Sequence, residues 1–226
     1  MVAAIGEIVR NGVMFDMKNW GGEAFNPESL PGVVEQLFAL FVERETDYLL
    51  VGGIALLSYV DGRNTQDVDF ILSRADLAGV PEIAVRDENR DFVRGDFSGL
   101  QIDLLLTQNK LFDLVRKRFA TVRSFGGLSI RTVTVEGLVL LKLYALPSLY
   151  RQGNFERVSI YESDITLLLM NYSVDLDAVM KILAKYLLES DLVEVRETMT
   201  EIQGRLRRFD RSRSQAKYSA VPNSKS

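Results

Sequence analysis

The sequence has neither cysteine nor histidine among its 226 residues, and these two absences narrow its chemistry. Without them the chain cannot form a disulfide, a zinc site of thiolates or imidazoles, a cysteine nucleophile or a Ser-His-Asp triad. Any catalysis must therefore use carboxylates, Lys, Arg, Ser, Thr, Tyr or a hard metal ion. Oxygen-only ligand sets suit Mg²⁺ or Mn²⁺ bound together with substrate phosphates.

Long apolar runs and a dominant charge sign are also missing. No stretch approaches the roughly 18 apolar residues of a membrane span, and the amino terminus lacks the basic and apolar regions of a secretion signal. The chain has 27 basic and 31 acidic residues, so no overall basic field indicates nucleic-acid binding. These absences predict a cytoplasmic, globular protein without membrane association. Its 47% hydrophobic content suffices for one sizeable core or two small domains.

The most informative segment joins a glycine pair to two alternating carboxylates. An apolar, strand-like run ends at Gly52-Gly53, and a helix is predicted to follow. Glycines let a phosphate approach the backbone closely, and a helix amino terminus favours an anion. A strand predicted over residues 66–72 places Asp67 and Asp69 on one face. Because adjacent carboxylates repel each other unless a cation lies between them, the segment predicts a phosphate cradle beside a metal site.

A third carboxylate, Asp103, lies among apolar residues in the second arm of a predicted hairpin. A buried charge is costly unless something compensates it. A metal ion shared with Asp67 and Asp69 would do so, and two such ions about 3.5–4 Å apart could bridge a triphosphate. The alternative is a structural carboxylate paired with Arg94 or Arg131.

Together these motifs resemble the DNA polymerase beta-like nucleotidyltransferase superfamily. Within it, the chain is most similar to AbiEii-type proteins, the toxin components of abortive-infection and toxin–antitoxin systems. The resemblance covers residues 30–170 and rests on Val-Gly-Gly-Ile-Ala-Leu, on Arg-Asn-Thr-Gln-Asp-Val-Asp-Phe seven residues later, and on Asp103. Members of the superfamily transfer a nucleoside monophosphate from a nucleoside triphosphate to a hydroxyl and release pyrophosphate. The resemblance therefore implies a nucleotidyltransferase that depends on Mg²⁺ or Mn²⁺.

The resemblance also implies a role for each matching residue. Gly52 and Gly53 would bind phosphate, and Asp67 and Asp69 would ligate the metal. Asp103 would complete the metal site and help to deprotonate the acceptor.

Three further positions are implied to bind the nucleotide. Arg63 would contact phosphate, with a surface ion pair as the alternative. Thr65 would also bind the nucleotide, or simply orient the acidic strand. Lys142 matches a lysine that the AbiEii-type branch places on the helix after the sheet, where its charge would reach a triphosphate.

The match weakens further along the chain. Arg151 and Asp164 align with polar positions of the branch, but Ile160 and Tyr161 stand where it has a basic–acidic pair. This departure concerns recognition of the base or the acceptor more than metal binding.

The periodicity of apolar residues predicts an α/β fold, with a mixed-sheet catalytic domain of the nucleotidyltransferase type followed by an α-helical domain. The catalytic domain spans residues 1–133, including an irregular lead-in over 1–27. The helical domain spans 134–210, and a disordered basic tail spans 211–226. Predicted helices cover 29–44, 54–59, 74–78, 110–118, 135–146, 160–171, 176–188 and 191–208; predicted strands cover 48–51, 66–72, 92–97, 100–106, 119–125 and 128–133; residues 81–89 are predicted to form a loop.

The partners expected of such a nucleotidyltransferase are a nucleoside triphosphate in the cleft between the two domains and an RNA acceptor, particularly a transfer RNA end. A toxin role would add a cognate antitoxin, and the apolar helices after residue 160 would serve as a core or a homodimer face. The basic residues between Lys110 and Arg131 would contact RNA or form a solvated face. The alternatives are nucleotidylation of an aminoglycoside-like small molecule or of a partner protein, and a regulatory protein that binds nucleotide without transfer.

Overall fold

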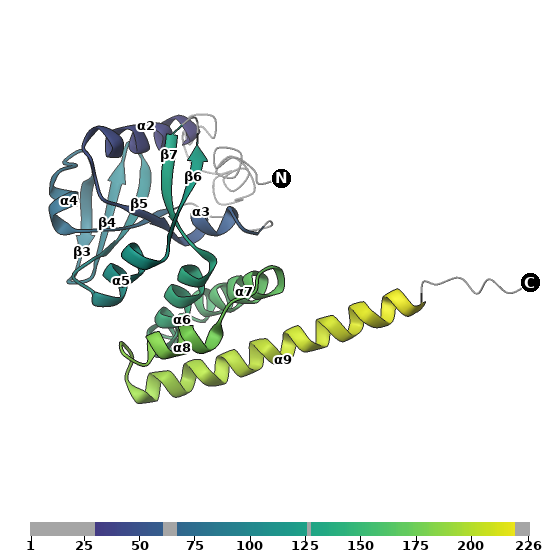
Figure 1. The fold of residues 1–226 in the computed structure, drawn as a ribbon. Coiled ribbons are helices and arrows are strands. Elements are labelled where there is room, and N and C mark those ends of the chain that lie inside the picture. Colours follow the sequence, from purple (N-terminus) through teal and green to yellow (C-terminus); the bar gives the residue numbers. More distant parts are fainter. Residues whose placement is uncertain (1–29, 61–66, 126–127, 220–226) are drawn as a thin grey trace, which may run out of the picture. The chain divides into compact units, whose positions relative to one another are not determined.

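A seven-stranded mixed sheet forms the centre of the amino-terminal part of the chain (Figure 1). The computed structural model describes residues 30–60, 67–125 and 128–219. The chain divides into two compact units, Met1–Leu141 and Lys142–Ser226. The strands are β1 (Leu49–Val51), β2 (Val68–Leu72), β3 (Ala84–Glu88), β4 (Phe92–Phe97), β5 (Leu100–Leu106), β6 (Ala120–Phe125) and β7 (Leu128–Val133), in the order β3-β4-β5-β2-β1-β7-β6.

The centre of the sheet brings the motif strands together. β2 runs antiparallel to β1 and parallel to β5, so it has neighbours of opposite direction on its two sides. Asp69 pairs in register with Val51 of β1 and with Asp103 of β5. The sheet is therefore mixed, as predicted, and the two strands that carry carboxylates are neighbours.

An aromatic cluster fixes which face of β2 is buried against helix α2 (Leu30–Glu43). Phe38 and Phe41 of α2 meet Tyr48 and Phe70 with ring centroids 4.8 to 5.9 Å apart. Such tilted and edge-to-face contacts are favourable for aromatic rings. Because side chains alternate along a strand, the burial of Phe70 against α2 turns Asp69 to the opposite face.

The remaining helices of the first unit are short. α3 (Gly52–Leu57), α4 (Arg74–Ala78) and α5 (Lys110–Arg118) follow β1, β2 and β5 respectively. Side chains of Ser73 and Asn109 cap the amino termini of α4 and α5. These three helices lie close to their predicted positions.

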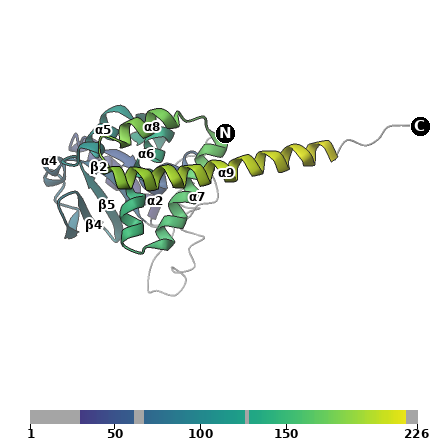
Figure 2. The same cartoon turned by 90° about the horizontal axis from the view of Figure 1, so that it is seen from below.

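All the regular secondary structure described in the second unit is helical. This unit contains most of α6 (Val135–Arg151), α7 (Phe155–Asn171), α8 (Leu176–Leu183) and α9 (Glu189–Ser219). Asn154 and Asp175 cap α7 and α8. Figures 1 and 2 both show α9 continuing beyond α7 and α8. The predicted α/β class, with a helical carboxyl-terminal part, is confirmed.

Two predictions from local sequence signals differ from the structure: one loop contains a strand, and one helix is longer than expected. Residues 81–89, predicted as a loop, contain the edge strand β3, whose five residues are all exposed. An exposed edge strand needs no apolar alternation, so its pattern resembles that of a loop. The helix predicted over 135–146 ends just before Pro147, yet α6 continues to Arg151. Proline removes one helical hydrogen bond, but the turn beyond it is held by Tyr150, whose hydroxyl donates to Glu162 at 2.6 Å.

The last helices also differ in length from prediction. α7 begins five residues earlier than expected, α8 ends at Leu183, and α9 continues to Ser219, into the stretch predicted as a disordered tail. Arg, Gln, Ala and Lys are good helix formers, and no proline interrupts the chain before Pro222. The predicted lead-in over 1–27 lies outside the described residues. Among the helices that the structure describes, none has the length and apolar character needed to cross a lipid bilayer.

Candidate functional site

The glycine pair forms the turn between β1 and α3. Gly52 has φ +66°, in the left-handed region that glycine tolerates best. A Cβ placed on Gly52 would lie 1.8 Å from Oδ2 of Asp69 and 2.3 Å from its Cγ. The turn therefore requires glycine for two independent reasons, and the second is the carboxylate packed against it.

The same carboxylate accepts a hydrogen bond from the turn. The backbone N–H of Gly53 donates to Oδ2 of Asp69 at 3.3 Å. One of the N–H groups predicted to bind phosphate thus contacts a side chain of the motif itself. This contact fixes the position of Asp69 relative to the turn.

The strand register brings two of the three predicted carboxylates side by side. Asp69 and Asp103 are paired residues of the parallel strands β2 and β5. Asp103 is 1% exposed, whereas Asp69 is half-buried. Asp67, also half-buried, precedes β2 by one residue and lies two positions from Asp69. Arg63 and Thr65 lie outside the described residues.

Asp103 is engaged by an arginine of the neighbouring strand. Arg94 pairs with Asp103 in the register of β4 and β5, and its Nε and Nη2 donate to Oδ1 and Oδ2 at 3.0 and 3.2 Å. This hydrogen bond and the charge of Asp103 raise the pKa of the Arg94 guanidinium, and the charge of Asp67 adds to the effect. The structural pairing with Arg94, considered as an alternative to metal binding, is therefore present, whereas Arg131 pairs with Asp47.

Carboxylates are the candidate metal ligands of this site. Carboxylate oxygens are the ligands that Mg²⁺ and Mn²⁺ prefer. Within residues 30–60, 67–125 and 128–219, however, no three acidic side chains are grouped so that they could hold a metal. Both oxygens of Asp103 face Arg94, which leaves Asp67 and Asp69 as the candidate ligands. A centre of three carboxylates is not preformed in this arrangement.

Lys142 belongs to the second unit, where its ammonium is buried and paired. Its Nζ lies 2.8 Å from Oδ2 of Asp164, and their side chains are 7% and 1% exposed. The same Nζ lies 4.3 Å from the ring centroid of Tyr161. Asp164 is therefore an established partner of Lys142, which had been predicted to contact phosphate.

Sequence reasoning missed the pair that Lys142 forms, and it named Arg94 only as one of two alternative partners of Asp103, although each pair had a signal. Lys142 and Asp164 both interrupt apolar helix faces, as two buried opposite charges do when they neutralise each other. Arg94 lies opposite Asp103 when the hairpin over 92–106 is closed at Ser98-Gly99. Hence the hairpin register, once assumed, identifies the partner of Asp103.

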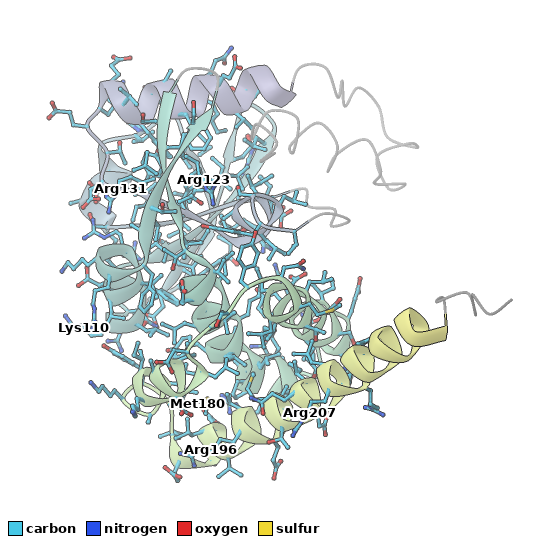
Figure 3. All side chains as sticks on the ribbon, turned by 45° about the vertical axis from the view of Figure 1, so that its right-hand side comes forward. Lys110, Arg123, Arg131, Met180, Arg196 and Arg207 are labelled. Atoms are coloured by element: carbon cyan, nitrogen blue, oxygen red, sulfur yellow. The ribbon has the colours of Figure 1, made fainter. Side chains whose placement is uncertain are left out.

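The basic cluster between Lys110 and Arg131 is largely paired within the first unit. Arg116 forms ion pairs with Asp47 and with Asp113, Lys117 pairs with Asp113 at 2.7 Å, and Arg131 pairs with Asp47. The hydrogen bond from Lys117 lowers the pKa of Asp113. Figure 3 labels Lys110, Arg123 and Arg131 on this unit, and the guanidinium of Arg123 lies 5.0 Å from the ring centroid of Tyr59. Internal partners thus neutralise much of the predicted basic surface.

No protein-family model and no curated protein matches the sequence. Several solved structures are similar in fold. The crystal structure of ANT(2'')-Ia in complex with adenylyl-2''-tobramycin has a TM-score of 0.45 at 13% identity, over 69% of this chain and 95% of that one. The solution structure of the antibiotic-resistance factor ANT(2'')-Ia has a TM-score of 0.43 at 11% identity, over 80% and 96%. An antigenic nucleotidyltransferase-like protein from Paracoccidioides brasiliensis has a TM-score of 0.43 at 17% identity, over 76% and 93%. The likeness is confined to the general fold.

Proposed function

We propose that the chain is a nucleotidyltransferase that moves a nucleoside monophosphate from a nucleoside triphosphate to a hydroxyl acceptor. One observation carries the proposal: the side chain of Asp69 is packed against the glycine turn at Gly52-Gly53 and is in register with buried Asp103. A close backbone approach beside clustered carboxylates is the arrangement that binding of a metal-bound triphosphate needs.

Mg²⁺ or Mn²⁺ belongs to this proposal as the expected cofactor. Asp67 and Asp69 are its candidate ligands, and Asp69 is already oriented by the N–H of Gly53. Such an ion would neutralise phosphate charge. Because Asp103 is occupied by Arg94, no chemical step is assigned to a metal held by all three carboxylates.

Asp103 was expected to deprotonate the acceptor hydroxyl, and its contacts set a condition on that role. Both oxygens of Asp103 already accept hydrogen bonds from the guanidinium of Arg94, so an acceptor hydroxyl would compete with Arg94 for them. Arg94 must therefore release at least one oxygen of Asp103 before that oxygen can take a proton. Arg94 is 41% exposed in its side chain, so this movement needs no rearrangement of the core.

The acceptor has two candidates. The AbiEii-type resemblance favours RNA, particularly a transfer RNA end, together with a toxin role and a cognate antitoxin. A polyanion is best bound by uncompensated Lys and Arg, whereas Arg116, Lys117 and Arg131 are paired with Asp47 or Asp113. This pairing weighs against the RNA candidate. The second candidate, a small hydroxylated compound of the aminoglycoside type, needs no such basic surface.

The test is transfer of label from nucleoside triphosphates in the presence of Mg²⁺ or Mn²⁺. Total RNA, cell extract and small hydroxylated compounds serve as acceptors in parallel. Label on RNA supports the first candidate, and label on a small compound supports the second. Label on a protein indicates a partner-protein substrate. Nucleotide binding without transfer to any acceptor would refute the proposed activity in favour of a regulatory protein.

A variant pair assigns the activity to the proposed site. Asp67→Ala with Asp69→Ala should abolish transfer while the protein stays folded. Glu35→Ala with Asp177→Ala removes the same charge from two exposed positions and should leave transfer intact. Transfer that survives the first double change would show that the chemistry lies elsewhere.

A further inference from the structure

Helix α9 (Glu189–Ser219) presents two different faces along its length. The inner face belongs to the core of the second unit, where its apolar residues recur at spacings of three and four. At most 6% of each of these residues is exposed: Leu192, Val195, Met199 and Ile202. The outer face has no such role within the unit, so its composition calls for another explanation.

The outer face of α9 is a continuous stripe, exposed except at half-buried Gly204, with a shallow groove. Its members recur at spacings of four and three residues, which places them on one side of an α-helix: Val193, Glu197, Thr200, Gly204 and Arg207. Val193, Arg196, Glu197, Thr200 and Glu201 line the groove. Val193 is 43% exposed at one end of it. In Figure 3, Arg196 lies near the start of α9 and Arg207 near its middle.

Gly204 belongs to this stripe and is the middle residue of α9. A Cβ built there would meet no atom of the described residues within 4 Å. Glycine is among the least favourable residues in a helix interior, and the packing of its own unit does not require it here. A residue without a side chain does allow a second helix to approach closely, because interhelical distance depends on the side chains at the contact.

The charges on either side of Gly204 are mostly opposite in sign, with Arg196 before it and Asp210 after it as exceptions. Glu194, Glu197 and Glu201 precede it, and Arg207 and Arg208 follow it. The helix dipole favours acidic residues in the first turn and basic residues in the last turn only. Since these residues flank the middle of a 31-residue helix, the dipole does not account for their separation.

We propose that the outer face of α9 binds the same face of a second copy of this chain, in antiparallel orientation across a two-fold axis at Gly204. Residues equally far before and after the axis then face each other. Glu201 faces Arg207 of the other copy, Thr200 faces Arg208, and the two glycines meet at the crossing. A parallel pair would set glutamate against glutamate, so the charges select the antiparallel one.

The expected complex is a reversible dimer. One helix crossing buries less than the roughly 1,200–2,000 Å² of a standard stable interface. Exposed charge pairs are also screened by salt. Dimerisation of the full chain should therefore weaken on dilution and on addition of salt.

Sedimentation velocity of the full-length protein across a dilution series tests this proposal. Reversal of the acidic side, Glu197→Arg with Glu201→Arg, should weaken dimerisation at least about tenfold by placing like charges together. Reversal of the basic side, Arg207→Glu with Arg208→Glu, should do the same. An equimolar mixture of the two variants should restore a dimer, because each then presents the charge that the other lacks.

Two further variants test whether these effects are specific to the outer face of α9. Lys181→Glu with Lys185→Glu makes a matched reversal at exposed positions on and just after α8, and should leave the dimer unchanged. Gly204→Leu should remove the dimer without loss of helix content by circular dichroism, since leucine favours the helix but blocks the crossing. A wild-type chain that is monomeric at every concentration would overturn the proposal. A dimer that both charge reversals leave intact, or a mixture that fails to dimerise, would also overturn it.

Discussion

Gly52→Ala isolates the steric contact on which the candidate site depends. An alanine at this position meets two separate costs. The first is its φ of +66°, which costs a residue with a side chain about 1–2 kcal/mol. The second is the new methyl group, which would lie 1.8 Å from Oδ2 of Asp69. That distance is well inside van der Waals contact, so the turn or Asp69 must move.

The two costs add to a measurable loss of stability. Displacing packed atoms to accommodate an extra carbon costs about 1–3 kcal/mol. The expected loss for Gly52→Ala is therefore about 2–5 kcal/mol in the free energy of unfolding. A shift of Asp69 by about 1 Å should also reduce transfer about 100-fold, because positioning dominates such chemistry.

Denaturant unfolding measures this loss, and two other glycines provide controls. Gly99 belongs to the same unit and has φ +84°, whereas Gly153 has φ +65°, almost that of Gly52. Neither has an atom within 4 Å of an added Cβ. Their alanine variants should therefore show only the backbone cost.

A double-mutant cycle with Asp69→Ala completes the test. Asp69→Ala removes the two closest atoms and leaves the Cβ at 2.7 Å, so it should recover part of the loss caused by Gly52→Ala. If Gly52→Ala costs no more than the two control substitutions, the carboxylate is not packed against the turn and the reasoning is refuted.

Three other contacts yield predictions of the same kind. Arg94→Gln should lower the free energy of unfolding by about 1–3 kcal/mol, since it leaves buried Asp103 without its partner while Arg94 itself is partly exposed. Adding Asp103→Asn should recover most of this loss in urea unfolding, and no recovery would contradict the pairing. Burial raises the pKa of Tyr48 to about 12. The contribution of this pKa shift to the free energy of unfolding is therefore complete below pH 10 and disappears as the pH rises towards 12, a loss of about 3 kcal/mol. Tyr48→Phe should flatten the alkaline stability curve, and an unchanged curve would exclude Tyr48 as the cause of that loss. Lys142→Met should lower the free energy of unfolding by about 3–5 kcal/mol, because it leaves the buried charge of Asp164 without its partner. Lys142→Met with Asp164→Leu should cost less, and equal losses in both variants would indicate that the pair is not coupled.

The centre of the fold was predictable because its signals are local. The glycine pair ends one strand, and alternation on the next strand directs Asp67 and Asp69 to one face. The apolar surroundings of Asp103 indicate that it needs a counter-charge. They do not say which one, because a metal ion and the guanidinium of Arg94 both neutralise a carboxylate. Only the register of β4 against β5 decides between them in this structure.

The remaining differences from prediction are non-local in origin. Whether Pro147 ends a helix depends on whether packing beyond it compensates for one lost hydrogen bond. Here Tyr150 reaches Glu162 on another helix. Likewise, β3 exists because β4 offers it an edge, with Ala84 paired to Asp96. Neither partner can be recognised from the residues next to the proline or within β3.

The pairing of β2 with β5 constrains how this chain can change during evolution. A strand that gains or loses one residue exchanges its two faces. Such a change within β5 would turn Asp103 away from Asp69 and bring Ile102 or Leu104 to its place. Insertions at Ser98-Gly99, at the tip of the hairpin, leave that alignment untouched. Homologous chains should therefore vary in length at the tip of this hairpin and keep the interval from Leu100 to Asp103 constant.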